Sequence, residues 1–310
     1  MPGPSVSKFT QVAPVAFGLL RRALHFSSLY KQFYIIIATL LFINIRSFPL
    51  VWHVRLLRHL IGWNLRRALS MDVTKYMEET SPVAQDPFKK EVSHSYWAGP
   101  DDCDFLGHLS NSAYAKNLDI VRMKVCVSNL RPFMLQGGFM PLAGADYAYL
   151  SEIPLFSYYE VRANVAGWDD KWIYLYSEFV TRPQSSKAAK RLEIATETAA
   201  QMTLDVPKHK PRSVRPDGTV LHCVAISRYC FKLGRLTVPP RIALGVCGFG
   251  EDRTNWNRSA AMQAQGTLRR FLEGGWRDQK GWDLPEFEEQ RRAGMEWCRQ
   301  LTLGINAAAP

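Results

Sequence analysis

One short run, residues 102–114 with the sequence DCDFLGHLSNSAY, constrains this chain more than any other feature. It places two carboxylates, a glycine, a histidine and an asparagine in a single turn, which leads directly into a segment with helical periodicity. Between Asn111 and Leu130 the apolar side chains recur every three or four residues, and this spacing predicts a helix with one buried stripe.

The start of such a helix is a suitable place for acid–base chemistry. Its first backbone N–H groups are unpaired and its dipole is positive there, so it can stabilise an oxyanion. An aspartate just before it can act as a base or a nucleophile beside that oxyanion site. A purely structural interpretation is also open, because Ser110, Asn111 and Ser112 are all good helix N-caps.

The pattern D-x-x-G-H-x-x-N-x-x-Y from Asp104 to Tyr114 resembles the signature of the hotdog-fold acyl thioesterases, the 4-hydroxybenzoyl-CoA thioesterase-like group. A second segment, from Lys232 to Pro240, resembles thioesterase-like proteins of filamentous-fungal natural-product clusters. The two similarities together extend over residues 88–250.

The resemblance implies an α+β hotdog fold, in which a bent antiparallel sheet wraps around one long helix. It implies that Asp104 is the catalytic carboxylate and that Asn111 and His108 belong to the catalytic site, where they position the loop and the substrate. Gly107 and Tyr114 are expected to contact the substrate, although Tyr114 equally suits a core position.

This chain departs from the family pattern at two positions. Ser110 replaces the first residue of the family's asparagine pair, and Asp119 stands where many relatives carry glutamate.

The implied reaction is the hydrolysis of an acyl thioester of coenzyme A or of an acyl-carrier protein, and the fungal similarity suggests secondary metabolism. No metal or other cofactor is expected, because the reaction requires a base and a site for the oxyanion. The family also implies a homodimer or a dimer of dimers.

Two alternatives to a thioesterase are open. One is a non-catalytic, membrane-tethered hotdog protein that binds acyl groups or acts as a scaffold. The other is a hotdog dehydratase, but the spacing of Asp104 and His108 does not resemble the dehydratase motif.

The formal net charge of +11 is concentrated at the N-terminus. Residues 1–70 carry nine Lys and Arg residues and no acid, whereas the other 240 residues hold 30 basic and 28 acidic side chains. Because the main body is nearly neutral, no nucleic-acid partner is expected.

The N-terminal segment has the composition of a membrane-associating element. Residues 32–45 form an uncharged apolar run that is shorter than the roughly 20 residues needed to cross a bilayer. Residues 47–70 predict a basic amphipathic helix, with Trp52 and Trp63 suited to a membrane interface. A mitochondrial leader and a pair of ordinary core helices are the alternatives. The expected location is an intracellular membrane, of the endoplasmic reticulum or another organelle, with the mitochondrion as the alternative.

The expected organisation is an anchor over residues 1–70, a linker over 71–87, the hotdog domain over 88–250 and a C-terminal helical extension over 251–310. The six cysteines are scattered without metal-ligand spacing, which predicts buried thiols and no metal site.

The pattern of apolar residues predicts most strands and helices, but residues 192–204 are ambiguous between helix and strand. The expected strands are Val92–Trp97, Phe139–Ile153, Tyr158–Val165, Lys171–Thr181 and Val220–Phe231, and the expected C-terminal helices are 255–272 and 284–301.

Overall fold

The computed structural model describes residues 30–182 and 213–307, and the side chains of residues 30–182 and 214–300. The chain divides into two compact units, Met1–Trp52 and His53–Pro310. In the first unit a helix over residues 30–43 is followed by the short 3-10 helix η2 (Ile45–Ser47), and nearly all of the side chains there are exposed.

The second unit is built on an antiparallel sheet with the strand order β1-β4-β5-β7-β3. Its main strands are β1 (Val92–Trp97), β3 (Leu142–Tyr149), β4 (Tyr158–Trp168), β5 (Ile173–Thr181) and β7 (Val220–Tyr229), and β6 (Ser213–Val214) pairs with β7. A smaller sheet joins β2 (Gly138–Phe139), β8 (Phe231–Leu233) and β9 (Leu236–Val238). Alternate residues of β4 and β5 are buried, so one face of the sheet is a core face.

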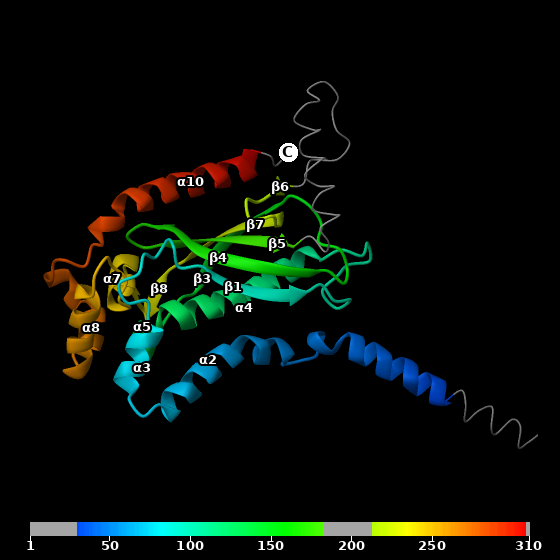
Figure 1. Ribbon diagram of the computed structural model, residues 1–310, viewed down its shortest axis with the longest axis horizontal. Coiled ribbons are helices and arrows are strands. Elements are labelled where there is room, and N and C mark those ends of the chain that lie inside the picture. The colour runs from blue at the N-terminus through cyan, green and yellow to red at the C-terminus, as the bar shows by residue number, and fades with distance from the viewer. Residues whose placement is uncertain (1–29, 183–212, 308–310) are drawn as a thin grey trace, which may run out of the picture. The chain divides into compact units, whose positions relative to one another are not determined.

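Helix α4 (Asn111–Asn129) lies along this core face (Figure 1). Its predicted stripe is confirmed, because Tyr114, Leu118, Val121 and Val125 are buried in the same cluster as the sheet residues. A long helix held against an antiparallel sheet is the arrangement expected for a hotdog fold.

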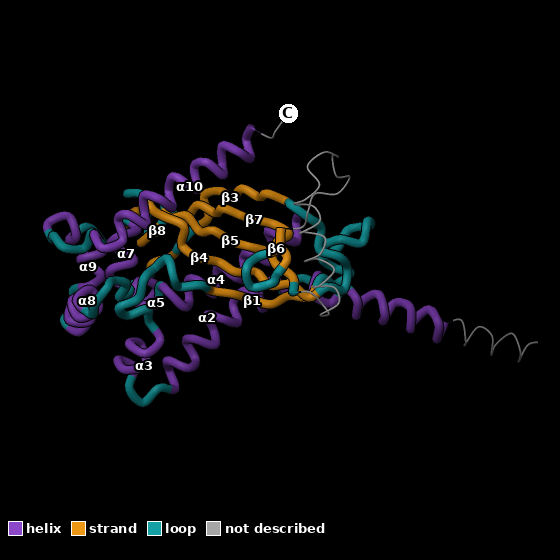
Figure 2. The backbone as a smooth tube through the Cα atoms, turned by 45° about the horizontal axis from the view of Figure 1, so that its top comes forward, coloured by secondary structure: helices purple, strands orange, loops and turns teal. Residues whose placement is uncertain are grey.

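Helix α10 (Glu288–Ala307) crosses the opposite face of the sheet (Figure 2). A side chain at Gly294 would place its Cβ 1.7 Å from the carbonyl oxygen of Ala166, so glycine is required for this close approach. Arg291 Nη1 also donates to the carbonyl oxygen of Trp168 over 2.7 Å. These contacts fix the first half of α10 on β4.

Shorter helices connect β9 with α10: α7 (Pro240–Val246), α8 (Thr254–Ala264), α9 (Leu268–Leu272), η3 (Gly275–Asp278) and η4 (Pro285–Phe287). The C-terminal region is therefore helical as expected, but the single helix predicted over residues 255–272 is wrong. It is divided into α8 and α9 at Gly266, where the backbone φ of +68° ends a right-handed helix.

The long helix ends at Asn129, in agreement with the apolar spacing between Asn111 and Leu130, and the short helix α5 (Arg131–Leu135), with Pro132 near its start, follows. One further expectation differs in detail. The strand expected over residues 139–153 is divided into β2 and β3, with Pro141, which has no N–H to donate, between them. Residues 192–204 lie outside the described residues.

The predicted amphipathic helix is confirmed as α2 (Val51–Leu69), but one of its two tryptophans, Trp63, is not at a surface. Trp63 is 3% exposed and packs with Met77, Val127 and Trp256, so the expectation of a membrane-interface role for Trp63 is wrong. Within the expected linker, residues after the N-cap Asp72 form helix α3 (Val73–Thr80).

The structure thus groups most of α2 with the unit that carries the sheet, whereas the expected N-terminal segment ended at residue 70. The domain boundaries stay predictions until the parts are expressed separately. No helix in the described parts of the chain is both long enough and apolar enough to cross a membrane.

Candidate active site

The turn before α4 holds the Asp104 carboxylate with main-chain hydrogen bonds. Asp104 Oδ1 accepts from the backbone N–H groups of Leu106 at 3.0 Å and of His108 at 3.4 Å. The turn closes at Gly107, whose φ of +80° is a conformation that favours glycine. Asp104 Oδ2 has no hydrogen-bond partner among the described residues, so one carboxylate oxygen remains available to a ligand.

A second loop, residues 152–155, fixes this turn from the side. The N–H of Leu109 donates to the carbonyl of Ile153 at 2.9 Å, and the N–H of Leu155 donates to the carbonyl of Gly107 at 2.8 Å. Glu152 Oε2 lies 3.2 Å from Nε2 of His108. Sequence reasoning missed Glu152, because it is far from the motif and no local pattern marks it.

The N-terminus of α4 supplies the expected hydrogen-bond donors. Ser110 is the N-cap by its backbone conformation, but its side chain makes no capping hydrogen bond. No acceptor for the N–H groups of Asn111 and Ser112 lies within residues 30–182 or 213–307. The side chain of Asn111 is exposed beside them, and its contact with a substrate stays a prediction.

The two aspartates of the motif have different environments. Asp102 is buried, pairs closely with Lys116 and accepts from Asn117 Nδ2 at 3.3 Å, while that same amide nitrogen lies 2.8 Å from the hydroxyl of Tyr159. Asp104 is exposed. Asp102 therefore anchors the turn to α4, and Asp104 is the exposed carboxylate of the two.

Tyr114 is buried beneath the site rather than open to it. Its ring centroid lies 4.8 Å from that of Phe179 and 5.2 Å from that of Tyr149, and burial raises the pKa of its hydroxyl well above the usual range. The structure favours the core role for Tyr114. Contact with an acyl chain stays a prediction, as it does for Gly107.

Apolar side chains surround the Asp104 turn without being covered. Phe105 is 96% exposed and Leu106 is also exposed. The rings of Trp97 and Phe156 stack with their centroids 5.8 Å apart. The backbone φ of Phe156 is +67°, which is unusual for a residue with a side chain. In the single chain the site is thus a polar turn with an open apolar rim.

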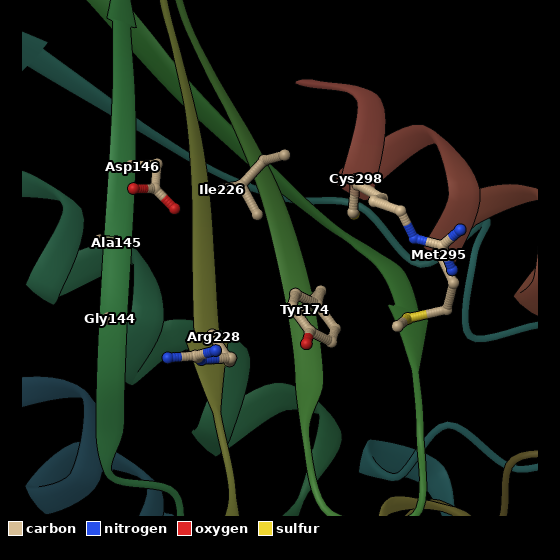
Figure 3. A pocket seen from close by; sticks show the side chains of 9 residues that line it. Gly144, Ala145, Asp146, Tyr174, Ile226, Arg228, Met295 and Cys298 are labelled. Carbon is tan, nitrogen blue, oxygen red and sulfur yellow. The ribbon is translucent and has the colours of Figure 1, made fainter. Parts of the chain in front are cut away.

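A cavity of about 550 Å³ lies on the other face of the sheet, between α10 and strands β3, β5 and β7 (Figure 3). Tyr174, Arg228 and Met295 are among its lining residues, and none of them comes from the Asp104 turn. In the described part of the chain no group of His, Cys, Asp and Glu residues could hold a metal ion.

Comparisons with known proteins agree with this geometry. Residues 98–222 match the thioesterase-like superfamily. The thioesterase lcsJ of Purpureocillium lilacinum is 25% identical over 300 residues, which cover 84% of this chain and 86% of that protein. A probable thioesterase of Saccharomyces cerevisiae is 29% identical over 160 residues, and this match spans about half of each protein, 51% of this chain and 55% of the relative.

Among solved structures, a 1,4-dihydroxy-2-naphthoyl-CoA thioesterase from Synechocystis aligns with 51% of this chain and 96% of its own length, at 9% identity and a TM-score of 0.34. The superfamily match begins just before the Asp104 turn and includes α4 and strands β3, β4 and β5. Residues 98–222, which contain these elements, are thus similar to the thioesterase-like superfamily, and the sheet with α4 along its core face has the hotdog fold.

Proposed function

We propose that this protein hydrolyses acyl thioesters of coenzyme A or of an acyl-carrier protein at the Asp104 turn. The observation that carries the proposal is the pairing of two features. The main chain holds one oxygen of Asp104, and the other oxygen has no partner among the described residues. A few residues away, the first N–H groups of α4 also lack an acceptor in that part of the chain.

In this proposal Asp104 either attacks the thioester carbonyl or removes a proton from an attacking water. Negative charge then develops on the carbonyl oxygen, where the N–H groups of Asn111 and Ser112 supply hydrogen bonds. If water is the nucleophile, collapse of the tetrahedral intermediate breaks the C–S bond and releases the acid, and the thiolate takes up the proton that Asp104 removed from the water. If Asp104 is the nucleophile, collapse releases the thiolate and leaves an anhydride between the acyl group and Asp104, which a water molecule then hydrolyses to the acid. The pair His108–Glu152 holds the loop in place beside the substrate.

The exposed rim supports a homodimer with the active site at the subunit interface, as the family resemblance implies. Phe105, Leu106 and Phe156 are large apolar side chains that water surrounds in the single chain, and a second subunit with a bound acyl chain would cover them. Strand β3 ends the main sheet with one edge unpaired by any described strand, so it offers backbone groups for pairing.

The similarity to a fungal thioesterase over most of the chain supports a role in secondary metabolism. A non-catalytic acyl-binding protein is the second candidate, and a specific observation favours it. The Asp104 Oδ1 hydrogen bond to the N–H of Leu106 is also what a purely structural turn would require.

The experiment is to incubate the purified full chain with acyl-CoAs of graded length and with acyl-carrier proteins, and to follow the release of free thiol. We expect turnover that depends on chain length. Saturable binding of an acyl-CoA without thiol release from any of these thioesters would support the acyl-binding alternative.

A further inference from the structure

Helix α2 is apolar on two opposite sides, and the folded unit covers one of them. On the covered side, Leu60 and Trp63 pack in the cluster with Met77, Val127 and Trp256. On the other side, side chains at helical spacing are exposed to solvent. This outer stripe consists of Val54 (65% exposed), Leu57 (38%), Ile61 (61%), Leu65 (57%) and Leu69 (74%).

An exposed apolar stripe of this length on a folded unit marks a site where a protein or a membrane covers it. A helix that is apolar on both sides is normally buried on both sides. Because Trp63 fixes the rotation of α2 on the unit, the outer stripe cannot turn inward without breaking the buried cluster.

The charges around the outer stripe indicate the chemistry of that partner. Residues 53–71 contain no acidic side chain, and α2 ends with Arg66 and Arg67 in its last turn. Along one border Arg58 Nη2 lies 3.0 Å from His94 Nε2, and Arg55 and Lys124 lie close enough to affect the same imidazole. Burial first, and then these cations, lower the pKa of His94 to about 4. Arg55 donates to the buried Asn117 Oδ1 over 3.2 Å and Lys124 donates to the carbonyl of Ser93, so both are partly buried. The exposed positive charge beside the outer stripe is therefore that of Arg58 and Arg66, and it suits anionic groups.

The segment before α2 also combines exposed apolar side chains with a lack of acidic residues. Between residues 30 and 50 the large apolar side chains are exposed, among them Phe33, Ile36, Leu40 and Phe42, and there is no acid in this stretch either. An apolar stripe flanked by arginines, joined to a second apolar segment, is typical of helices that lie in the plane of an anionic membrane surface.

We propose that the outer stripe of α2 lies in the headgroup boundary of an anionic lipid membrane. Helix α2 then has two roles. Its inner side packs against the core of the folded unit, and its outer side binds the lipid and so holds the folded unit at the membrane. Helix α4 lies between α2 and the sheet, and α10 lies on the far side of the sheet, so the unit has one defined side toward the membrane (Figure 1). This proposal does not depend on thioesterase activity.

The test uses the full chain with a polarity-sensitive dye on a cysteine introduced by Ile61→Cys, and a matched chain with the dye at Gln290→Cys on α10. Five native cysteines are buried and Cys103 is partly buried, so the parent protein treated with the dye serves as the blank. Vesicles contain phosphatidylcholine alone or with phosphatidylserine, with and without nitroxide-labelled lipid.

We expect the dye at position 61 to shift to the blue and to be quenched by nitroxide lipid, more strongly with phosphatidylserine and less at high salt. The dye at position 290 should respond to neither kind of vesicle. The proposal is overturned if the protein floats with vesicles while the dye at position 61 is unaffected, because residues before α2 would then carry the binding. A blue shift that rises with protein concentration without vesicles would instead identify a second copy as the partner.

A second measurement places a negative charge on the outer stripe and follows the partitioning of the protein onto vesicles. Ile61→Asp should lower the vesicle partition coefficient at least about tenfold, because one large apolar side chain is lost from the lipid contact. Leu236→Asp, which alters an exposed leucine on β9, is the matched control and should leave partitioning unchanged. Equal partitioning of both variants and the parent would contradict the proposal.

Discussion

Replacing Trp63 with alanine should severely destabilise the folded unit, although this residue lies in a segment that the sequence marks as a membrane element. The indole is 3% exposed and contacts residues from α3, α4 and α8, so its removal leaves a large cavity between these helices. Truncation of a buried aromatic residue costs about 3–5 kcal/mol of unfolding free energy. For a unit of this size, that loss corresponds to a melting temperature about 6–20 °C lower.

The indole N–H of Trp63 allows a second variant to be predicted. Trp63 Nε1 is buried and finds no acceptor among the described residues, and an unsatisfied buried donor costs about 1–3 kcal/mol. Trp63→Phe keeps most of the apolar area and removes that N–H, so it should cost much less than Trp63→Ala.

Leu57→Ala, on the outer stripe of the same helix, is the control and should change stability by no more than about 0.5 kcal/mol. Urea unfolding followed by circular dichroism measures all three variants. Wild-type stability of Trp63→Ala would refute the reasoning, because α2 would then not belong to the core. The same reasoning predicts that a chain starting near Asp72 would lose its fold.

Three further results are expected. Asp102→Asn should cost about 2 kcal/mol in urea unfolding, because the partly exposed Lys116 loses its buried partner; an unchanged midpoint would place Asp102 outside the core network. Gly294→Ala should lower stability by about 1–3 kcal/mol despite alanine's better helix propensity, since its Cβ would overlap the carbonyl oxygen of Ala166, and calorimetry against Gln290→Ala tests this. Stability should rise with pH between about 4 and 6.5, because the unfolded chain binds a proton at His94 there and the folded chain does not. The effect is about 2 kcal/mol for this partly exposed ring, and unfolding at both ends of that pH range should differ less in His94→Gln than in the parent.

The Asp104 turn and α4 could be predicted from sequence because their signals are local. The spacing of Asp104, Gly107 and Asn111 fixes a turn and a helix start within one short segment, and the stripe from Tyr114 onward has the period of one buried helix face. The alternation in β4 and β5 is equally local, and both strands occur where they were expected.

The parts that could not be predicted depend on contacts between distant residues. Nothing near Glu152 indicates that its loop lies against His108. Helix α2 presents a different problem, because Leu60 and Trp63 form one apolar stripe and Val54 and Ile61 form another on the opposite side. Periodicity reveals that such a helix exists, but it cannot tell which stripe the rest of the protein covers.

The most direct test of the proposed function is the rate of thiol release by Asp104→Asn. Asparagine can still accept the N–H of Leu106 through its side-chain oxygen, so the turn should persist and stability should change by no more than about 1 kcal/mol. Asp101→Asn, in the same turn, is the control for a general effect of charge.

With the acyl-CoA that the parent hydrolyses best, we predict that Asp104→Asn lowers kcat about 100-fold or more with an unchanged melting temperature, and that Asp101→Asn retains most of the activity. Full activity of Asp104→Asn would contradict the assignment of Asp104 as the base or nucleophile.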